Sequence, residues 1–332
     1  MPRAYLSLNA QERLEFILEA GEALKSEPSV LEKDIWVCWA LKALFSLELP
    51  MVFKGGTSLS KVYRAINRFS EDLDITIDHA SSGDVLTDPI AANVSNTKRR
   101  EFSDRMKLYT QQQVQDLIVP HLQRQADDLE QVTVKVTGEG DEIQIKYLQV
   151  IENGYILPHL KLEFGSRSSI EPSALYFIQP DVMAWEVAKQ LEFPSITLPV
   201  LLAERTFWEK VTLIHAELTR KNPKIILDRY SRHWYDLSQL ANHAVGSRAL
   251  QRLEIRDHVI RTKTALFGIS GVNYDQVALG QFQLIPKHDL NLALEQDYTA
   301  MLKAGMFEGA APPWNDILLR LKNLERSINY HS

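Results

Sequence analysis

Residues 51–78 read MVFKGGTSLSKVYRAINRFSEDLDITID and combine four local signals in one order. An apolar run ends at a Gly-Gly-Thr-Ser turn, a short helical segment follows, and a second apolar run carries Asp72 and Asp74. Carboxylates two positions apart on a strand project from the same face, because side chains alternate with a period of two. Free amides at a turn that opens a helix can bind phosphate, and such carboxylates can bind divalent metal. The segment therefore indicates metal-assisted nucleotide chemistry.

The composition is that of an ordinary globular protein. The chain has 332 residues, of which 45% are hydrophobic and 24% charged, and a formal net charge of −6. This length allows two domains or one large one. We see no signal peptide and no apolar run long enough to span a bilayer, and the single cysteine, Cys38, excludes an intrachain disulfide. We therefore expect a cytoplasmic protein without membrane contact, whose acidity disfavours indiscriminate nucleic-acid binding.

Apolar periodicity predicts a mixed α+β N-terminal half and a helical C-terminal half. Two helices open the chain, with capping boxes expected at Asn9/Glu12 and Ser29/Glu32. The further predicted elements are strands at 51–53, 73–77 and 160–164, a hairpin of 132–136 with 143–150, and helices at 58–66, 98–129, 201–218 and 229–242.

The glycine turn, formed by Gly55, Gly56, Thr57 and Ser58, admits two interpretations. As a phosphate cradle, its glycines let the backbone approach phosphate oxygens closely, and Ser58 donates its hydroxyl. As a plain strand-to-helix turn, Thr57 or Ser58 would be the N-cap of the helix. It is not a P-loop, because no Gly-Lys-Ser/Thr follows at the required spacing.

The two aspartates favour the cradle. Asp is disfavoured in strands, although charged residues are common on the outer face of an edge strand. Here Leu73, Ile75 and Ile77 give the opposite face a fully apolar character. Asp72 and Asp74 are therefore predicted metal ligands that position a nucleotide triphosphate.

Residues 159–165, HLKLEFG, predict a further strand with a polar face. Leu160, Leu162 and Phe164 would face the core and leave Glu163 on the same face as Lys161. Spacing alone leaves two interpretations open. Glu163 is either a third carboxylate, as metal ligand or general base, or one half of a Lys–Glu pair on an exposed strand.

The run KGGTSLSKVYRAINRFSEDLDI resembles the first motif of the AbiEii/AbiGii-type toxin nucleotidyltransferases, a branch of the DNA polymerase β-like superfamily. Three further stretches match that family in order, namely Glu32-Lys33-Asp34-x-Trp36, ERTFWEK at 204–210 and RHWYDL at 232–237. The resemblance implies a polymerase β-like mixed sheet flanked by helices, followed by a helical half. We assign residues 1–195 to the nucleotidyltransferase domain with its N-terminal helices. Residues 196–332 form a helical domain that completes the active-site cleft.

The resemblance also implies a reaction, in which a nucleotide passes from an NTP to an acceptor with Mg²⁺ or Mn²⁺ as cofactor. Glu163 would complete the metal ligands, although the wider superfamily uses Asp there. Lys210 would offset triphosphate charge with Asp236 as its support, and Arg68 and Ser70 would contact the nucleotide beside the glycine turn.

The biological setting implied is a toxin–antitoxin or phage-defence system. The acceptor would be a tRNA 3′ end, which would block translation and growth, and the partner would be a cognate antitoxin. Two alternatives remain. One is nucleotidyl (AMP) transfer to a protein hydroxyl, and the other is a catalytically silent module that binds a nucleotide or a partner.

Single residues of the helical half keep ordinary interpretations as well. Lys210 could be a solvated lysine beside Thr206, and Arg205 with Glu209 reads as a surface ion pair. For His233 we expect a structural role. A local basic excess is a candidate phosphate-facing patch or solvated loop charge; it comprises Arg205, Lys210, Arg220, Lys221, Lys224, Arg229 and Arg232.

Overall fold

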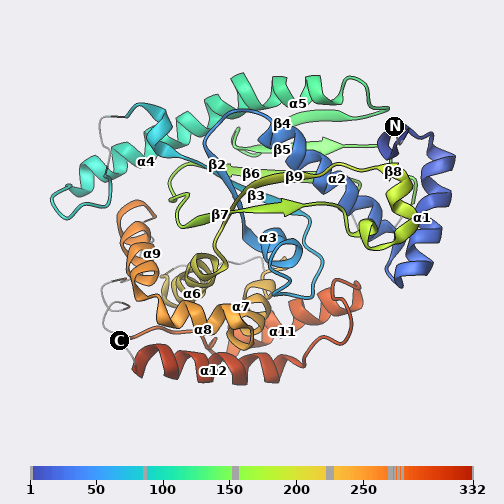
Figure 1. Ribbon diagram of the computed structural model, residues 1–332. Helices are drawn as coiled ribbons and strands as arrows, with labels where there is room; N and C mark the ends of the chain where they lie inside the picture. Colours follow the sequence, from blue (N-terminus) through green and yellow to red (C-terminus); the bar gives the residue numbers. More distant parts are fainter. Residues whose placement is uncertain are drawn as a thin grey trace. The chain divides into compact units, whose positions relative to one another are not determined.

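The computed structural model describes residues 3–330, apart from 85–87, 152–156, 222–227, 268–271, 273, 275–276 and 278–279. Contacts divide the chain into two compact units (Figure 1). The sheet unit comprises Met1–Thr57, Ser70–Gly83 and Arg105–Val200, and the helical unit comprises Ser58–Phe69, Asp84–Asp104 and Leu201–Ser332. Each unit thus combines segments that are separated in the sequence, and the domain boundary after residue 195 stays a prediction.

A seven-stranded mixed sheet forms the centre of the sheet unit. Its strand order is β4-β5-β6-β3-β2-β9-β7. The strands are β2 (Met51–Lys54), β3 (Asp72–Ile77), β4 (Thr133–Thr137), β5 (Glu142–Lys146), β6 (His159–Gly165), β7 (Ser173–Ile178) and β9 (Ile196–Leu201). β3 pairs in parallel with β6 and antiparallel with β2. The predicted α+β fold with a mixed sheet is confirmed.

Strands β3 and β6 each bury one face, as their alternation predicts. Leu73 and Ile75 on β3 and Leu160 and Leu162 on β6 are almost wholly buried. The residues between them are only partly buried. Burial of each such side chain stabilises the fold by about 1.5–3 kcal/mol, which fixes which face of the sheet remains polar.

The sheet unit also contains helices. They are α1 (Ala10–Leu24), α2 (Pro28–Phe45), the part of α4 (Asn96–Gln113) from Arg105 on, and α5 (Val119–Ala126), with a π-helical turn at Val114–Ile118. α5 contacts β4 and α2, and Figure 1 shows it running along β4. Short 3₁₀ turns lie at Tyr5–Ser7, His79–Ser82, Asp181–Ala184 and Glu186–Gln190, and β1 (Arg3–Ala4) pairs with β8 (Leu191–Glu192).

The two predicted capping boxes have different outcomes. At α1 the Asn9 side chain accepts from the Glu12 amide and Glu12 accepts from the Asn9 amide, which confirms the box. At α2 the prediction is wrong, because the helix begins at Pro28 with Glu27 as N-cap. Glu32 instead accepts hydrogen bonds from the amides of Val150 and Ile151. The Glu32 side chain thus binds a distant loop and does not cap the helix.

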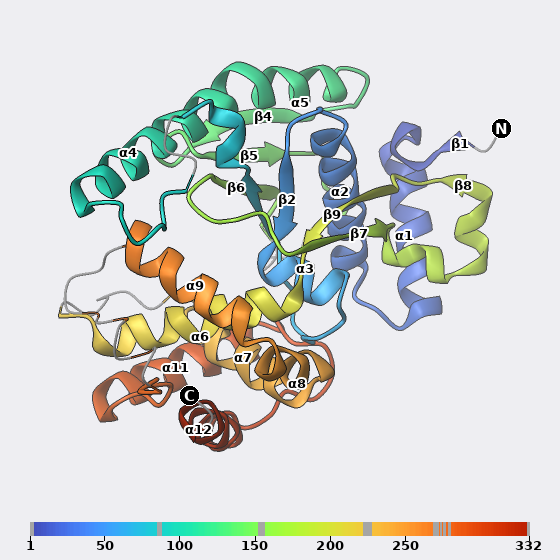
Figure 2. The same cartoon turned by 60° about the vertical axis from the view of Figure 1, so that its left-hand side comes forward.

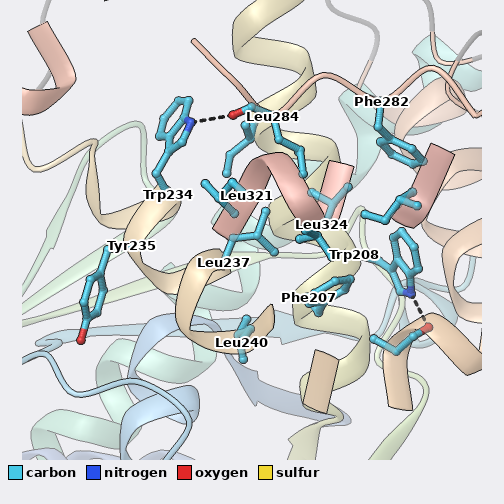
Figure 3. Close-up of a cluster of buried hydrophobic side chains, with 14 of the residues drawn as sticks. Phe207, Trp208, Trp234, Tyr235, Leu237, Leu240, Phe282, Leu284, Leu321 and Leu324 are labelled. Carbon is cyan, nitrogen blue, oxygen red and sulfur yellow. Dashed lines mark hydrogen bonds between the residues drawn. The ribbon is translucent and has the colours of Figure 1, made fainter. Parts of the chain in front are cut away.

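Among the described residues after Leu201, six helices of the helical unit pack around one core. They are α6 (Ala203–Thr219), α7 (Arg232–Asn242), α8 (Ala244–Gln251), α9 (Leu253–Leu266), α11 (His288–Lys303) and α12 (Trp314–Tyr330). α6 packs against α7, α8 and α9, and α12 packs along α7 (Figure 2). Figure 3 shows two buried tryptophans of this core. Trp208 donates to the Ala249 carbonyl at 3.1 Å and Trp234 to the Leu284 carbonyl at 3.0 Å, so neither indole N–H is left unpaired.

Two strands of the seven-stranded sheet, β7 and β9, were not predicted from the sequence. β9 contains Pro199, which reads as the end of an element, and it pairs with β2 through Phe53 and Val200. β7 lies at the edge of the sheet and exposes Leu175 and Phe177, so its burial does not alternate as an inner strand's would. Among the described residues, no helix is both long and apolar enough to cross a membrane.

Candidate active site

The three predicted carboxylates lie on one face of two neighbouring strands in the sheet unit. Asp74 on β3 is the register partner of Glu163 on β6, and Asp72 is the partner of Lys161. Neighbouring strands are about 4.8 Å apart, so partners on the same face project side by side. All three carboxylates are partly exposed. The sheet therefore brings Glu163 beside Asp72 and Asp74, although Glu163 follows them by about 90 residues in the chain.

The glycine turn packs directly against the second aspartate. Gly55 has φ +79°, and a Cβ added there would lie 1.9 Å from Asp74 Oδ2 and 2.9 Å from Asp74 Cβ. This close approach and the positive φ both require glycine. The backbone at the start of α3 (Gly55–Lys61) is therefore in contact with the carboxylate of β3.

Thr57 ties the same turn to the beginning of β3. Its hydroxyl lies 2.5 Å from the Asp72 carbonyl oxygen, to which it donates, and 3.1 Å from Ser70 Oγ. The helix begins at Gly55, so neither Thr57 nor Ser58 is its N-cap, and the plain capping interpretation is wrong. Ser58 is fully buried.

Lys161 lies among the carboxylates. Its Nζ is 2.5 Å from Glu163 Oε1 and 3.0 Å from Glu142 Oε1. Partial burial lowers the pKa of Lys161, but its hydrogen bonds to Glu163 and Glu142 outweigh this and raise it to about 12. The Lys–Glu pair that the spacing allowed is thus present. It does not exclude a metal, because an ionised carboxylate accepts at both oxygens.

Asp72 and Asp74 are oxygen donors of the kind that bind a divalent metal. Within the described part of the chain, no three His, Cys, Asp or Glu side chains are grouped as a ready-made metal cage. Mg²⁺ commonly takes one or two carboxylates and receives its remaining oxygens from substrate phosphates and water. Asp72 and Asp74 match that use, since both are partly exposed carboxylates on one face.

In the helical unit, Asp236 on α7 binds two cations. Its carboxylate accepts from Arg68 Nε at 2.6 Å and Nη2 at 2.8 Å, and Lys210 Nζ on α6 lies 2.8 Å away. Asp236 is wholly buried, and Arg68 and Lys210 are 3% and 8% exposed. Burial raises the pKa of the Asp236 carboxyl, but the charges of Arg68 and Lys210 hold it well below its ordinary value. Asp236 therefore stays ionised and fixes both cations.

Polar atoms without partners lie next to this ion triad. Thr206 is one helical turn before Lys210, and its buried hydroxyl has no hydrogen-bond partner among the described residues. The same holds for His233 Nδ1. Burial and the neighbouring charge of Lys210 lower the pKa of His233 well below its usual value, so the ring is neutral. An acceptor-rich ligand could satisfy these groups.

Other residues of the helical half lie where the sequence did not place them. Arg205 is 1% exposed, so its pair with Glu209 is not a surface pair. In the suggested phosphate-facing patch, Arg220 pairs with Glu217 at 2.8 Å, and Lys210 pairs with Asp236. Lys224 lies outside the described residues, so its part of the prediction stays untested. Arg68 was expected beside a phosphate, and its guanidinium is bound to Asp236.

Several contacts of the site had no local signal in the sequence. The Arg68–Asp236 pair joins residues 168 apart, and a buried Lys33–Glu71 pair joins residues 38 apart. A cavity of about 250 Å³ in the sheet unit is lined by residues such as Trp39, Lys42 and Phe193. None of its lining residues is a candidate site residue, so the cavity is separate from the carboxylates.

Comparison with known proteins gives the family and the fold of the chain. The chain matches the family described as "Nucleotidyl transferase AbiEii toxin, Type IV TA system" over residues 39–320. No curated protein matches it significantly. Among solved structures it is similar to MenT4, a nucleotidyltransferase toxin from Mycobacterium tuberculosis H37Rv, at 17% identity and a TM-score of 0.50. That likeness covers 98% of this chain and 94% of the other. At this identity it shows the shared fold.

Proposed function

Because the chain belongs to the AbiEii nucleotidyl transferase toxin family of type IV toxin–antitoxin systems, we propose that it transfers a nucleotide from an NTP to a tRNA 3′ end with Mg²⁺ as cofactor. The family makes the chain a nucleotidyltransferase, and the acceptor and the metal are the proposed part. The observation that carries the proposal is the pairing of β3 with β6, which aligns Asp74 with Glu163 beside Asp72.

Asp72 and Asp74 would hold the metal, and Glu163 would act as a further ligand or as the general base for the attacking hydroxyl. Bound there, Mg²⁺ or Mn²⁺ would stabilise charge on the transferred phosphoryl group. Lys161 would hold the Glu163 carboxylate in place through their ion pair. All four side chains lie on the same polar face of β3 and β6, so the three carboxylates can act on one bound metal.

The NTP would be bound by backbone and cationic groups. Gly55 and Gly56 would let the α3 backbone approach the phosphates, with Thr57, Ser58 and Ser70 as neighbouring hydroxyls. Lys210 would offset triphosphate charge, because Asp236 holds its ammonium in one position and Thr206 offers an unused hydroxyl beside it. Arg68 would add to this positive charge.

The charge distribution supports a polyanionic acceptor. The helical unit carries 23 Lys and Arg against 18 Asp and Glu, whereas the sheet unit carries 14 against 25. The helical unit is therefore net positive in a chain of net charge −6. Such an excess attracts the phosphate backbone of RNA, and binding should weaken as salt rises.

The first experiment follows the label of the NTP. Purified protein with Mg²⁺ and tRNA should transfer label from an α-labelled NTP and not from a γ-labelled one. Equal transfer from the γ position would indicate a kinase and overturn the proposal. Label on a protein in place of RNA would favour nucleotidyl transfer to a protein hydroxyl.

Matched variants test the carboxylates. Asp74→Asn should lower the rate by about 10²-fold or more, because a misplaced or missing catalytic ligand has effects of this size. Glu163→Gln should lower it strongly, whereas Glu142→Gln should not, although both glutamates contact Lys161. Equal rates for the two Gln variants would show that Glu163 has no role in the reaction.

In the cell we propose a growth-inhibiting toxin of the cytoplasm, opposed by a cognate antitoxin, in a toxin–antitoxin or phage-defence role. Its expression should arrest growth, and that of Asp74→Asn should not. Sequencing of RNA 3′ ends after both expressions would identify the acceptor. Growth arrest by Asp74→Asn equal to that of the unmodified protein would show that the toxicity does not need nucleotide transfer.

A further inference from the structure

Lys33 is a buried cation that joins three parts of the sheet unit. It lies in α2 and is 0% exposed. Its Nζ donates to Glu71 Oε2 and to the carbonyl oxygen of Leu157, the latter at 2.8 Å. Both partners are far from it in the sequence, by 38 and 124 residues.

The two partners of Lys33 stand at the beginnings of the two strands that carry the candidate metal ligands. Glu71 immediately precedes β3, and Leu157 is two residues before β6. These strands are parallel, so their beginnings lie side by side. The Lys33 ammonium therefore links the beginning of β3, which carries Asp72 and Asp74, to the beginning of β6, which carries Glu163.

The residues around Lys33 hold α2 in place. Glu32 accepts from the amides of Val150 and Ile151, and Asp34 accepts from the Asp181 amide at 2.7 Å. Trp36 stacks on Tyr147 with a ring-centroid distance of 4.7 Å. The helix is thus attached on several sides, and Lys33 projects from a rigid support.

A buried ion pair is a weak device for stability alone. Well-packed apolar residues in its place are often as stabilising or more so, because two charges must be taken out of water. What Lys33 adds over an apolar residue is a directed link to one carboxylate and one carbonyl. Such a link constrains the beginnings of β3 and β6 relative to each other, and metal ligands on different strands depend on how those strands are placed.

We propose that Lys33 is a positioning residue that sets the separation between Asp72 and Asp74 on β3 and Glu163 on β6, and thereby the affinity for divalent metal. The inference rests on the proposed metal-binding role of these carboxylates. Lys33 acts through Glu71 and Leu157, and it does not touch the metal or the substrate.

The test measures metal binding directly, by calorimetric titration of purified protein with Mn²⁺ alone. The principal variant is Lys33→Met/Glu71→Gln, which removes the ion pair without leaving a buried charge. It should bind Mn²⁺ about tenfold more weakly or worse, the usual effect of losing a group that orients metal ligands. Lys33→Arg keeps the donor and should bind Mn²⁺ within about threefold of the unmodified protein, on the same scale.

Lys42→Met is the matched control, since Lys42 is an exposed lysine in the last turn of the same helix. It should leave Mn²⁺ binding unchanged. Unaltered Mn²⁺ affinity of a folded Lys33→Met/Glu71→Gln protein would overturn the positioning role and leave the proposed function intact. Equal titrations for Asp74→Asn and the unmodified protein would instead overturn the metal site itself. If the double variant does not fold, loss of Mn²⁺ binding in a folded Lys33→Arg protein overturns the inference as well.

Discussion

Substitution of Gly55 by alanine tests whether the glycine turn positions Asp74. The new Cβ would lie 1.9 Å from Asp74 Oδ2, whereas an ordinary contact needs at least 3.4 Å. Rotation of the carboxylate alone does not relieve the clash, because Asp74 Cβ is also only 2.9 Å away. Either β3 or the start of α3 must therefore move, and the carboxylate moves with it.

The expected magnitudes follow from these distances. An alanine at φ +79° costs about 1–2 kcal/mol for its left-handed backbone. Overpacking against Asp74 adds about 1–3 kcal/mol. A displacement of about 1 Å at a catalytic group lowers the rate by about 10²-fold. Gly55→Ala should therefore lose about 2–5 kcal/mol of stability in total and about 10²-fold in rate, so the rate is compared on protein that is still folded.

Gly83→Ala is the matched control for the cost of placing alanine in a left-handed backbone conformation. Gly83 has φ +69°, and an added Cβ would meet nothing within 4 Å. This variant should lose about 1–2 kcal/mol of stability and keep its activity. The assays are transfer of α-labelled nucleotide and urea unfolding, done on both variants. Activity of Gly55→Ala within about threefold of Gly83→Ala would refute the positioning of Asp74 by the turn, given the effect of about 10²-fold expected for displacement.

Two further predictions concern ionised groups. Asp236→Asn removes the carboxylate charge that Arg68 and Lys210 share in the interior and should cost about 3–5 kcal/mol in urea unfolding. Since the folded-state pKa of Asp236 lies below the ordinary 3.8, its contribution is complete above that value and is lost as pH falls further. The difference from the unmodified protein should narrow from pH 5 to pH 3, and a constant difference would contradict this. The pKa of Lys161 is raised from 10.5 to about 12. Its ion pairs therefore stabilise the fold fully below pH 10.5, and this stabilisation is lost as the pH rises through 12. Lys161→Met should thus lose less than about 1 kcal/mol at pH 9, and this difference should shrink as the pH rises from 10.5 toward 12.

Local patterns predicted the elements of the site well because they depend on neighbouring residues. The alternation in residues 72–77 and 159–165 assigned the polar faces of β3 and β6. Local signals failed where a distant group competed for the same side chain. Glu32 was expected to cap α2 and instead binds the amides of Val150 and Ile151. Strand β9 was not predicted, because it contains Pro199 and proline is rare inside strands.

The sequence by itself determined that Asp72, Asp74 and Glu163 lie on polar faces of strands, because a period of two is a property of the strand alone. Its motifs also determined the family. Only the tertiary structure decided that β3 pairs with β6 so that Asp74 stands beside Glu163, and that Asp236 binds Arg68 and Lys210. Strand pairing and buried ion pairs join segments that are far apart in the sequence. They depend on how the whole chain packs, and no short stretch of it carries that information.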